Sequence, residues 1–187
     1  MNRSIRIRAL SLSALSMVVL LLIGCASTQP QRTYYSLNPL EPVAEPLNPP
    51  VRVSRVRIPE YIDNDRIWVR RDNQRMTSLP NVRWSESLSP AVTRELRIAL
   101  GASLSDDRNV PTLLLDIERL EAQWDDDRQR VILYARWQLE GTQQTAPENI
   151  QLQRDLDELE ADIIAETMTE MLSEMRAMIR AGLTEAL

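Results

Sequence analysis

Residues 113–139 read LLLDIERLEAQWDDDRQRVILYARWQL, and the spacing of apolar side chains in this stretch decides the fold. In its second half every other residue is apolar, at Val131, Leu133, Ala135, Trp137 and Leu139. The first half alternates in the same way and then slips by one residue, with Leu113, Leu115 and Ile117 followed by Leu120, Ala122 and Trp124. A period of two is typical of a strand with one buried face. Aspartates at 125–127 mark a turn, so we expect a long antiparallel hairpin with one face in the core.

Shorter elements are expected before the hairpin. Apolar alternation and turn residues predict three strands, at 51–58, 66–71 and 75–79, the first with a slip of phase that indicates a bulge or bend. A helix follows, in which leucine or valine recurs every four positions, at Leu88, Val92, Leu96 and Leu100. Ser89-Pro90 offers this helix an N-cap with proline at the first helical position.

A short strand at 150–152 and a long helix over about 157–186 are expected after the hairpin. The helix carries an apolar stripe with steps of four and three residues, at Ile164, Met168, Met171, Met175, Met178 and Gly182. Together these elements predict an α+β fold: an antiparallel sheet of about five strands with two helices packed on one face, one of them the long C-terminal helix.

The first 24 residues have the composition of a signal peptide. Three arginines, Arg3, Arg6 and Arg8, precede an apolar run over 9–23 that is shorter than the ~20 residues a membrane-spanning helix needs. The run ends in LIGC at 22–25, which resembles the lipobox of bacterial lipoproteins. The resemblance implies cleavage between Gly24 and Cys25, a thioether from Cys25 to diacylglycerol, and acylation of the new amine with a chain such as palmitate. The alternative is a short uncleaved anchor in which the Cys25 thiol is not modified.

The segment after the lipobox predicts a tether and then one domain. Residues 25–50 begin with the lipidated Cys25 and are rich in proline, which favours extended, semi-rigid chain. Within this segment, residues 34–37 have strand propensity and are a candidate to pair with the domain. Residues 51–187 are expected to form a single α+β domain. Ala26 stands where aspartate would be the usual signal for retention in the inner membrane, so the resemblance implies the outer membrane, with the domain facing the periplasm.

Composition excludes several classes of chemistry. The chain has no His, and each of its 22 basic residues is Arg, so Ser–His–Asp or Cys–His nucleophile systems, Schiff-base lysines and Walker-type phosphate loops are absent. The single Cys cannot form an internal disulfide, and four glycines are too few for a glycine-rich phosphate cradle. Loss of residues 1–24 removes three arginines and no acid, which changes the net charge from −5 to −8. A net acidic, exported protein is a poor candidate for binding nucleic acid.

The ordered features resemble the PqiC/YmbA family, the auxiliary lipoproteins of ABC-type lipid transport systems. The matching pieces are the hairpin, the C-terminal helix and the segments LIGC at 22–25, TYYSL at 33–37, 51–59, EYID at 60–63 and RWSESL at 83–88. The sequence departs from the family in having no Phe. The resemblance implies a non-enzymatic protein without cofactors, held at the outer membrane. Its expected partner is a periplasm-spanning MCE-domain (PqiB-like) protein, and ring-shaped homo-oligomers occur in the family.

Each candidate functional site in the domain also has a purely structural explanation. The aspartates at 125–127 suggest calcium, but their spacing matches no ligand loop and a solvated turn is favoured. The acids Asp155, Asp157, Glu158, Glu160 and Asp162 suggest paired catalytic carboxylates, but a charged helix start is favoured. We expect no catalytic residue and no metal site. Trp84, Met168, Met171 and Met175 form the candidate partner interface, with burial in the core as the favoured alternative.

Charge is uneven along the domain. Residues 51–97 hold ten Arg and six acids, whereas residues 105–187 hold eight Arg and nineteen acids. This asymmetry fits complementarity within one domain, and it also fits a head-to-tail ring in which basic and acidic patches meet. Three functions remain in order of preference: a docking lipoprotein that supports membrane integrity, a periplasmic lipoprotein that carries lipid in an apolar cavity, and an envelope hydrolase using carboxylates.

Overall fold

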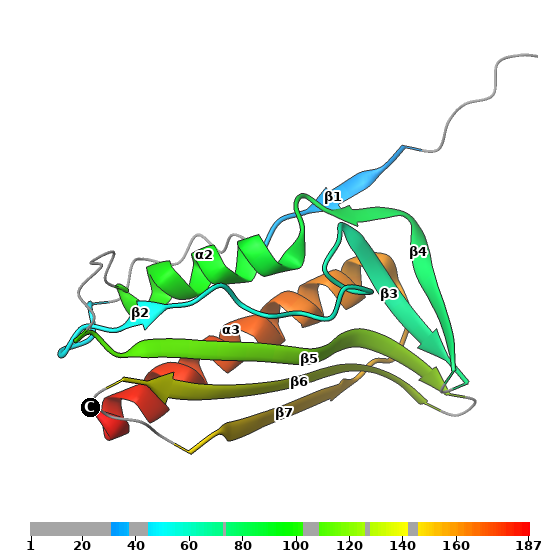
Figure 1. Cartoon of the computed structure of the whole chain (residues 1–187). Coiled ribbons are helices and arrows are strands. Elements are labelled where there is room, and N and C mark those ends of the chain that lie inside the picture. The colour runs from blue at the N-terminus through cyan, green and yellow to red at the C-terminus, as the bar shows by residue number, and fades with distance from the viewer. Residues whose placement is uncertain (1–30, 38–44, 73, 103–108, 126–127, 142–145) are drawn as a thin grey trace, which may run out of the picture. The chain divides into compact units, whose positions relative to one another are not determined.

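The computed structural model describes residues 31–37, 45–72, 74–102, 109–125, 128–141 and 146–187. Residues Arg32–Leu187 form one compact unit. Its elements, labelled as in Figure 1, are β1 (Thr33–Tyr35), β2 (Arg52–Val53), β3 (Arg66–Arg71), β4 (Arg75–Trp84), α2 (Leu88–Leu100), β5 (Thr112–Asp125), β6 (Arg128–Glu140), β7 (Glu148–Asp155) and α3 (Ala161–Ala186). The predicted α+β class is confirmed.

The strands form one mixed sheet in the order β1-β4-β3-β5-β6-β7, with β2 paired to β5 outside this path. The pairs β3/β4, β5/β6 and β6/β7 are antiparallel, whereas β1/β4, β2/β5 and β3/β5 are parallel. The sheet has seven strands where about five were predicted, and it contains three parallel pairs where all pairs were expected to be antiparallel. Each parallel pair joins strands that are not consecutive in sequence, and apolar alternation within a strand carries no information about such a partner.

The β5/β6 hairpin is confirmed, and the slip in its apolar pattern is a bulge. Leu113 lies opposite Leu139, and Leu115 lies opposite Trp137. The register shifts between Ile117 and Arg119, after which the apolar positions on the two strands face each other again. The extra residue in β5 keeps both halves of the strand on the core side. We call this core side the inner face of the sheet and the opposite side the outer face.

Both helices lie on the inner face. The helix α3 packs on β5, β6 and β7, and α2 packs beside α3 and on β2 (Figure 1). The buried stripe of α3 consists of Ile164, Ala165, Met168, Met171, Leu172, Met175, Arg176, Ile179 and Leu183. Met178, assigned to the stripe from its spacing, instead has 44% of its side chain exposed, and Ile179 takes the core position.

The start of α2 differs from the prediction. Its N-cap is Ser87, and Ser89 lies within the first turn. The Ser89 hydroxyl donates a hydrogen bond to the carbonyl of Val56 at 2.7 Å, so it ties the helix to the segment before β3. Gly101 ends the helix in the left-handed region at φ 56°, where a Cβ atom would stand 2.6 Å from Pro46 Cα.

The domain begins earlier than residue 51. Strand β1 pairs with β4, and the side chains of Leu37 and Leu47 are 5% and 9% exposed. The amide of Leu47 also donates to the carbonyl of Leu100 at the end of α2. Parts of the predicted tether, at β1, Leu37 and Leu47, therefore pack on the domain, and the pairing of residues 34–37 is confirmed for Tyr34 and Tyr35. Among helices in the described part of the chain, none has the length and apolarity needed to cross a bilayer.

Candidate functional site

Apolar and polar side chains alternate along β5 and β6, and the polar side chains lie on the outer face of the sheet. On β5 and β6 these positions pair Asp116 with Arg136, Arg119 with Tyr134, Glu121 with Ile132, and Gln123 with Arg130. Neither helix covers this face, because both pack on the inner side. The outer face is therefore where this domain presents organised charge to its surroundings.

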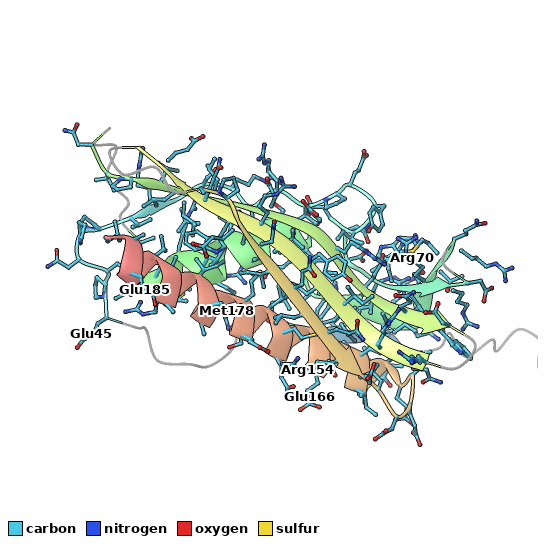
Figure 2. All side chains as sticks on the ribbon, turned by 90° about the horizontal axis from the view of Figure 1, so that it is seen from below. Glu45, Arg70, Arg154, Glu166, Met178 and Glu185 are labelled. Atoms are coloured by element: carbon cyan, nitrogen blue, oxygen red, sulfur yellow. The ribbon has the colours of Figure 1, made fainter. Side chains whose placement is uncertain are left out.

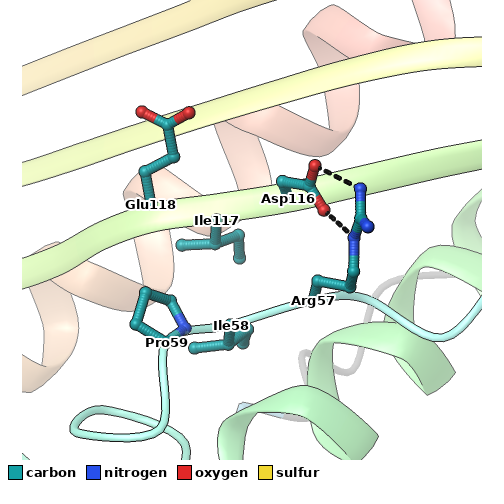
Figure 3. Close-up of a pocket in the computed structure, with 6 residues that line it drawn as sticks. All are labelled: Arg57, Ile58, Pro59, Asp116, Ile117 and Glu118. Atoms are coloured by element: carbon teal, nitrogen blue, oxygen red, sulfur yellow. Dashed lines mark hydrogen bonds and ion pairs between the residues drawn. The ribbon is translucent and has the colours of Figure 1, made fainter.

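A shallow hollow of about 390 Å³ opens on this face beside β5. Its lining consists of Arg57, Ile58, Pro59, Asp116, Ile117 and Glu118, and Figure 3 shows them as sticks. The backbone holds the two walls together, because the amide of Ile117 donates to the carbonyl of Arg57 at 2.9 Å. We call this feature the groove.

A two-point ion pair closes one end of the groove. Arg57 Nε and Nη2 donate to the two carboxylate oxygens of Asp116 at 2.5 and 2.7 Å (Figure 3). The hydrogen bond that Arg57 donates to Asp116 raises the pKa of Arg57. A second pair joins Arg136 to Glu118, across β5 and β6. The Arg57 and Arg136 side chains are 73% and 50% exposed, so their unused donors face solvent.

Further along β5, a fully buried carboxylate is held by three side chains. Arg70 donates from Nε to Glu121 Oε1 at 2.6 Å and from Nη2 to Oε2 at 2.9 Å. Arg119 Nε donates to Oε1 at 3.0 Å, and the Tyr61 hydroxyl donates to Oε2 at 3.3 Å. The Glu121 side chain is 0% exposed, whereas Arg70 and Arg119 are 20% and 31% exposed. We call these four residues the Glu121 cluster.

The electrostatics of the cluster favour a fixed negative charge. Burial alone raises the pKa of Glu121, but hydrogen bonds from Arg70 and Arg119 outweigh it and hold that pKa below its usual range. Burial, followed by the nearby charge of Glu121, raises the pKa of Tyr61. An ionised carboxylate with its oxygens occupied is a poor general acid, since that role needs a raised pKa. The arrangement suits binding and positioning rather than proton transfer.

The predicted lipidation residues, Gly24 and Cys25, lie outside the described residues. The four candidate interface residues lie in the core: Trp84, Met168, Met171 and Met175 have exposed fractions of 2%, 1%, 1% and 0%. Their burial leaves a partner no accessible surface on them in this structure.

Of the candidate acids at 125–127, Asp126 and Asp127 lie outside the described residues. Asp125 ends β5, forms an ion pair with Arg130 at 3.3 Å and accepts hydrogen bonds from the Gln123 amide at 3.0 and 3.1 Å. Asp162 accepts a hydrogen bond from the Tyr35 hydroxyl, which raises the pKa of Tyr35 to about 12. The other acids of its segment, Asp155, Asp157, Glu158 and Glu160, are exposed. Within the described ranges, no group of three or more His, Cys, Asp or Glu side chains is placed to hold a metal ion.

The groove and the Glu121 cluster were missed by the sequence analysis. The available signal was the run DIERLE at 116–121, where charges fall at the positions between apolar residues. That run shows which residues face outward. It does not show their partners, because Arg57, at an isolated bridge between β2 and β3, and Arg70 on β3 meet β5 only in the folded sheet.

Comparison with known proteins agrees with this architecture. A model of the family described as ABC-type transport auxiliary lipoprotein component matches residues 35–180. No curated protein matches the sequence. The domain is similar to an uncharacterized protein of known crystal structure, with a TM-score of 0.68 and 16% identity over 82% of this chain and 99% of that chain. It is also similar to a DUF330 protein from Xanthomonas campestris, with a TM-score of 0.63 and 15% identity over 79% of this chain and 92% of that chain. At these identities the likeness concerns the fold alone.

Proposed function

Because the chain belongs to the ABC-type transport auxiliary lipoprotein family, we propose that it is a non-enzymatic docking subunit of a lipid transport system. The observation that carries the proposal is the family match over residues 35–180. In this account the protein is held by lipid at the outer membrane and faces the periplasm. There it binds a periplasm-spanning MCE-domain protein and so supports the integrity of the envelope.

The anchor in this proposal is Cys25. Its thiol takes the diacylglycerol after which the signal peptide, residues 1–24, is removed. Buried acyl chains contribute ~0.8 kcal/mol per CH₂, so two or more chains hold a protein stably on a bilayer. Membrane attachment then depends on one residue, while the domain remains free to bind a partner.

Packing of the interior favours docking over the alternative of a lipid carrier. A carrier needs an apolar hollow between sheet and helices. Here that space is filled by large side chains, among which Trp84, Trp137, Leu133, Met171 and Met175 are at most 2% exposed. Two hollows on the described surface, of about 390 and 310 Å³, are lined in part by charged residues. Neither lining suits an acyl chain.

Directions of the pKa shifts also favour a binding role. A carboxylate-based hydrolase needs an acid with a raised pKa. In the described part of the chain, the two carboxyl groups with resolved shifts, Glu86 and Glu121, both have lowered pKa values. Arginine hydrogen bonds cause both shifts, and such pairs hold structure or bind partners.

A homo-oligomeric ring remains part of the proposal. The ion pairs Arg57–Asp116 and Arg70–Glu121 join the basic first part of the domain to its acidic second part within one chain. The acids at 155–160 stay exposed and are available to a neighbouring copy's arginines. Light scattering of the lipid-free domain across a salt series tests this: we expect assemblies that dissociate as salt rises, and an assembly indifferent to salt contradicts it.

The anchor and location are tested by substitutions in the lipobox region. We expect Cys25→Ser to abolish the mass increase of lipidation and to leave the signal peptide uncleaved, while the neighbouring control Ser27→Ala changes neither. Ala26→Asp should keep the lipid but move the protein to the inner-membrane fraction. A Cys25→Ser protein that still carries the lipid mass contradicts the lipid anchor, and an Ala26→Asp protein that stays in the outer membrane contradicts the proposed sorting.

A further inference from the structure

We propose that one end of the domain, formed by β1 and the first turns of α3, rests on the zwitterionic phospholipid surface to which Cys25 is anchored. The inference rests on the proposed lipid anchor and adds an orientation to it. We call this end, which carries Tyr34 and Ile163, the membrane end. The opposite end, at the C-terminus of α3, then points into the periplasm and toward a partner.

Chain length brings this end close to the bilayer. The compact unit begins at Arg32, so only six residues separate it from Cys25. Even a fully extended chain between these two residues spans at most ~25 Å, whatever conformation it takes. The helix α3 alone has 26 residues and is about 39 Å long. The anchor therefore reaches one end of the domain more readily than the other.

Contacts within the domain show which end this is. Strand β1 pairs in register with residues 82–84 of β4. The Tyr35 hydroxyl donates to Asp162 in the first turn of α3. The chain from the anchor therefore enters the domain beside the N-terminus of α3, while the C-terminus of α3 lies at the other end (Figure 1).

Two exposed apolar side chains lie at the membrane end. Tyr34 is 58% exposed, and Ile163, next to Asp162, is 37% exposed. Tyrosine is favoured at membrane interfaces because its ring is apolar and its hydroxyl stays hydrated. Together with the anchored lipid, these two residues give the membrane end an apolar contact with the headgroup region.

Charge selects the type of lipid. The exposed acids Asp155, Asp157, Glu158 and Glu160 immediately precede α3. Anionic headgroups would repel this segment, whereas zwitterionic headgroups carry no net charge to do so. The orientation should therefore be strongest on phosphatidylcholine and weaken when phosphatidylglycerol is added at low salt.

A distance measurement on vesicles tests the orientation. Cys25 is the only cysteine, and lipidation consumes its thiol, so an engineered cysteine is the only reactive one. Glu166→Cys and Glu185→Cys are matched, because both replace exposed glutamates of α3, toward its two ends (Figure 2). These positions lie about 28 Å apart along the helix axis. Each is labelled with a fluorophore, and the lipidated protein is placed in phosphatidylcholine vesicles that carry nitroxide headgroups.

We expect several-fold stronger quenching at 166 than at 185. Tyr34→Ser with Ile163→Ser should reduce the quenching at 166, whereas Ile98→Ser with Met178→Ser, which changes two exposed apolar residues elsewhere, should leave it unchanged. Equal quenching at both positions in protein that floats with vesicles overturns the orientation but leaves the anchor intact. Unchanged quenching in the Tyr34/Ile163 variant overturns their contact with lipid. Protein that lacks lipid and does not float overturns the anchor and the inference together.

Discussion

Gly182 of α3 lies directly against the indole ring of Trp137 on β6. A Cβ atom at position 182 would stand 2.6 Å from Trp137 Cζ2 and 3.1 Å from Cη2, closer than side chains approach each other. The glycine therefore lets α3 sit on the sheet with the tryptophan fully buried beneath it. This contact fills the space between this part of α3 and β6.

Replacing Gly182 by alanine tests that contact. Overpacking a core lowers the free energy of unfolding by ~1–3 kcal/mol, whereas replacing a helical glycine by alanine raises it by about 1 kcal/mol. We expect Gly182→Ala to lower the free energy of unfolding by about 1 kcal/mol, measured by urea denaturation. In a Trp137→Leu background the ring is gone, so the same substitution should become neutral or stabilising. A stabilised Gly182→Ala protein in the parent background would contradict the close contact.

Glu121 should make stability depend on acidic pH. Its folded-state pKa lies below the ~4.3 of an unperturbed glutamate, so the unfolded chain binds more protons as pH falls. The stability that its ionised form contributes is present above about pH 4.3 and is lost as pH falls through the folded-state pKa. Denaturation at pH 7 and pH 3 should show a large deficit for Glu121→Gln at pH 7 and a smaller one at pH 3.

Asp116→Asn is the control for this comparison, because that carboxylate is paired with a largely exposed arginine. Its effect should be small at both pH values, since exposed ion pairs contribute at most about 1 kcal/mol. A Glu121→Gln deficit that is the same at pH 3 as at pH 7 would show that the charge of Glu121 does not stabilise the fold.

Tyr35 should titrate above the usual range of a tyrosine side chain. The hydrogen bond to Asp162 raises its pKa to about 12, above the usual ~10. The folded state favours neutral Tyr35, so this contribution to stability is present below pH ~10 and is lost as pH rises toward 12. The absorbance difference between the parent protein and Tyr35→Phe should therefore report an ionisation near 12. Asp162→Asn should bring it back toward 10, and a Tyr35 that ionises near 10 in the parent would mean that β1 is not tied to α3.

A buried ion pair joins the two helices. Arg176 Nη1 lies 3.3 Å from Glu95 Oε2, and their side chains are 8% and 6% exposed. Breaking such a pair leaves an unpaired buried charge and costs ~3–5 kcal/mol, while replacing both partners by apolar residues is often neutral. We expect Glu95→Leu, which removes the carboxylate facing buried Arg176, to destabilise the protein strongly in thermal and urea unfolding. Arg176→Met should destabilise it less, because Arg94 remains 3.4 Å from Glu95 Oε1. The double variant should be more stable than either, and additive losses would contradict the coupling.

The features that are local in sequence were predictable. Strict alternation at 131–139 predicted the strand that became β6. The shift in apolar phase after Ile117 was also visible in the sequence, and the structure shows that it is a bulge. The spacing of apolar residues also predicted the buried stripe of α3 as far as Met175. The prediction failed at Met178, because Met178 and Ile179 are both apolar and only the position of the sheet decides which one is buried.

Features that depend on distant partners were not predictable. The proline content of residues 45–50 predicted a tether, yet Leu47 packs on the end of α2, where Gly101 leaves room for Pro46. The alternation of apolar residues at 120 and 122 placed Glu121 on the outward side of a strand and indicated nothing more. The burial of Glu121 depends on Arg70, and β3 brings Arg70 beside β5 through a parallel pairing that no local pattern encodes.

The proposed role of this protein is to dock a periplasm-spanning transport component at the outer membrane. This role is tested most directly by crosslinking in cells, affinity purification of the full lipidated chain and mass spectrometry of the recovered proteins, with Cys25→Ser as the non-lipidated control. We expect recovery of an MCE-domain protein, with crosslinked residues on the domain away from the membrane end. Recovery of other envelope machinery without any MCE-domain protein would contradict the proposed function while leaving the lipid anchor in place.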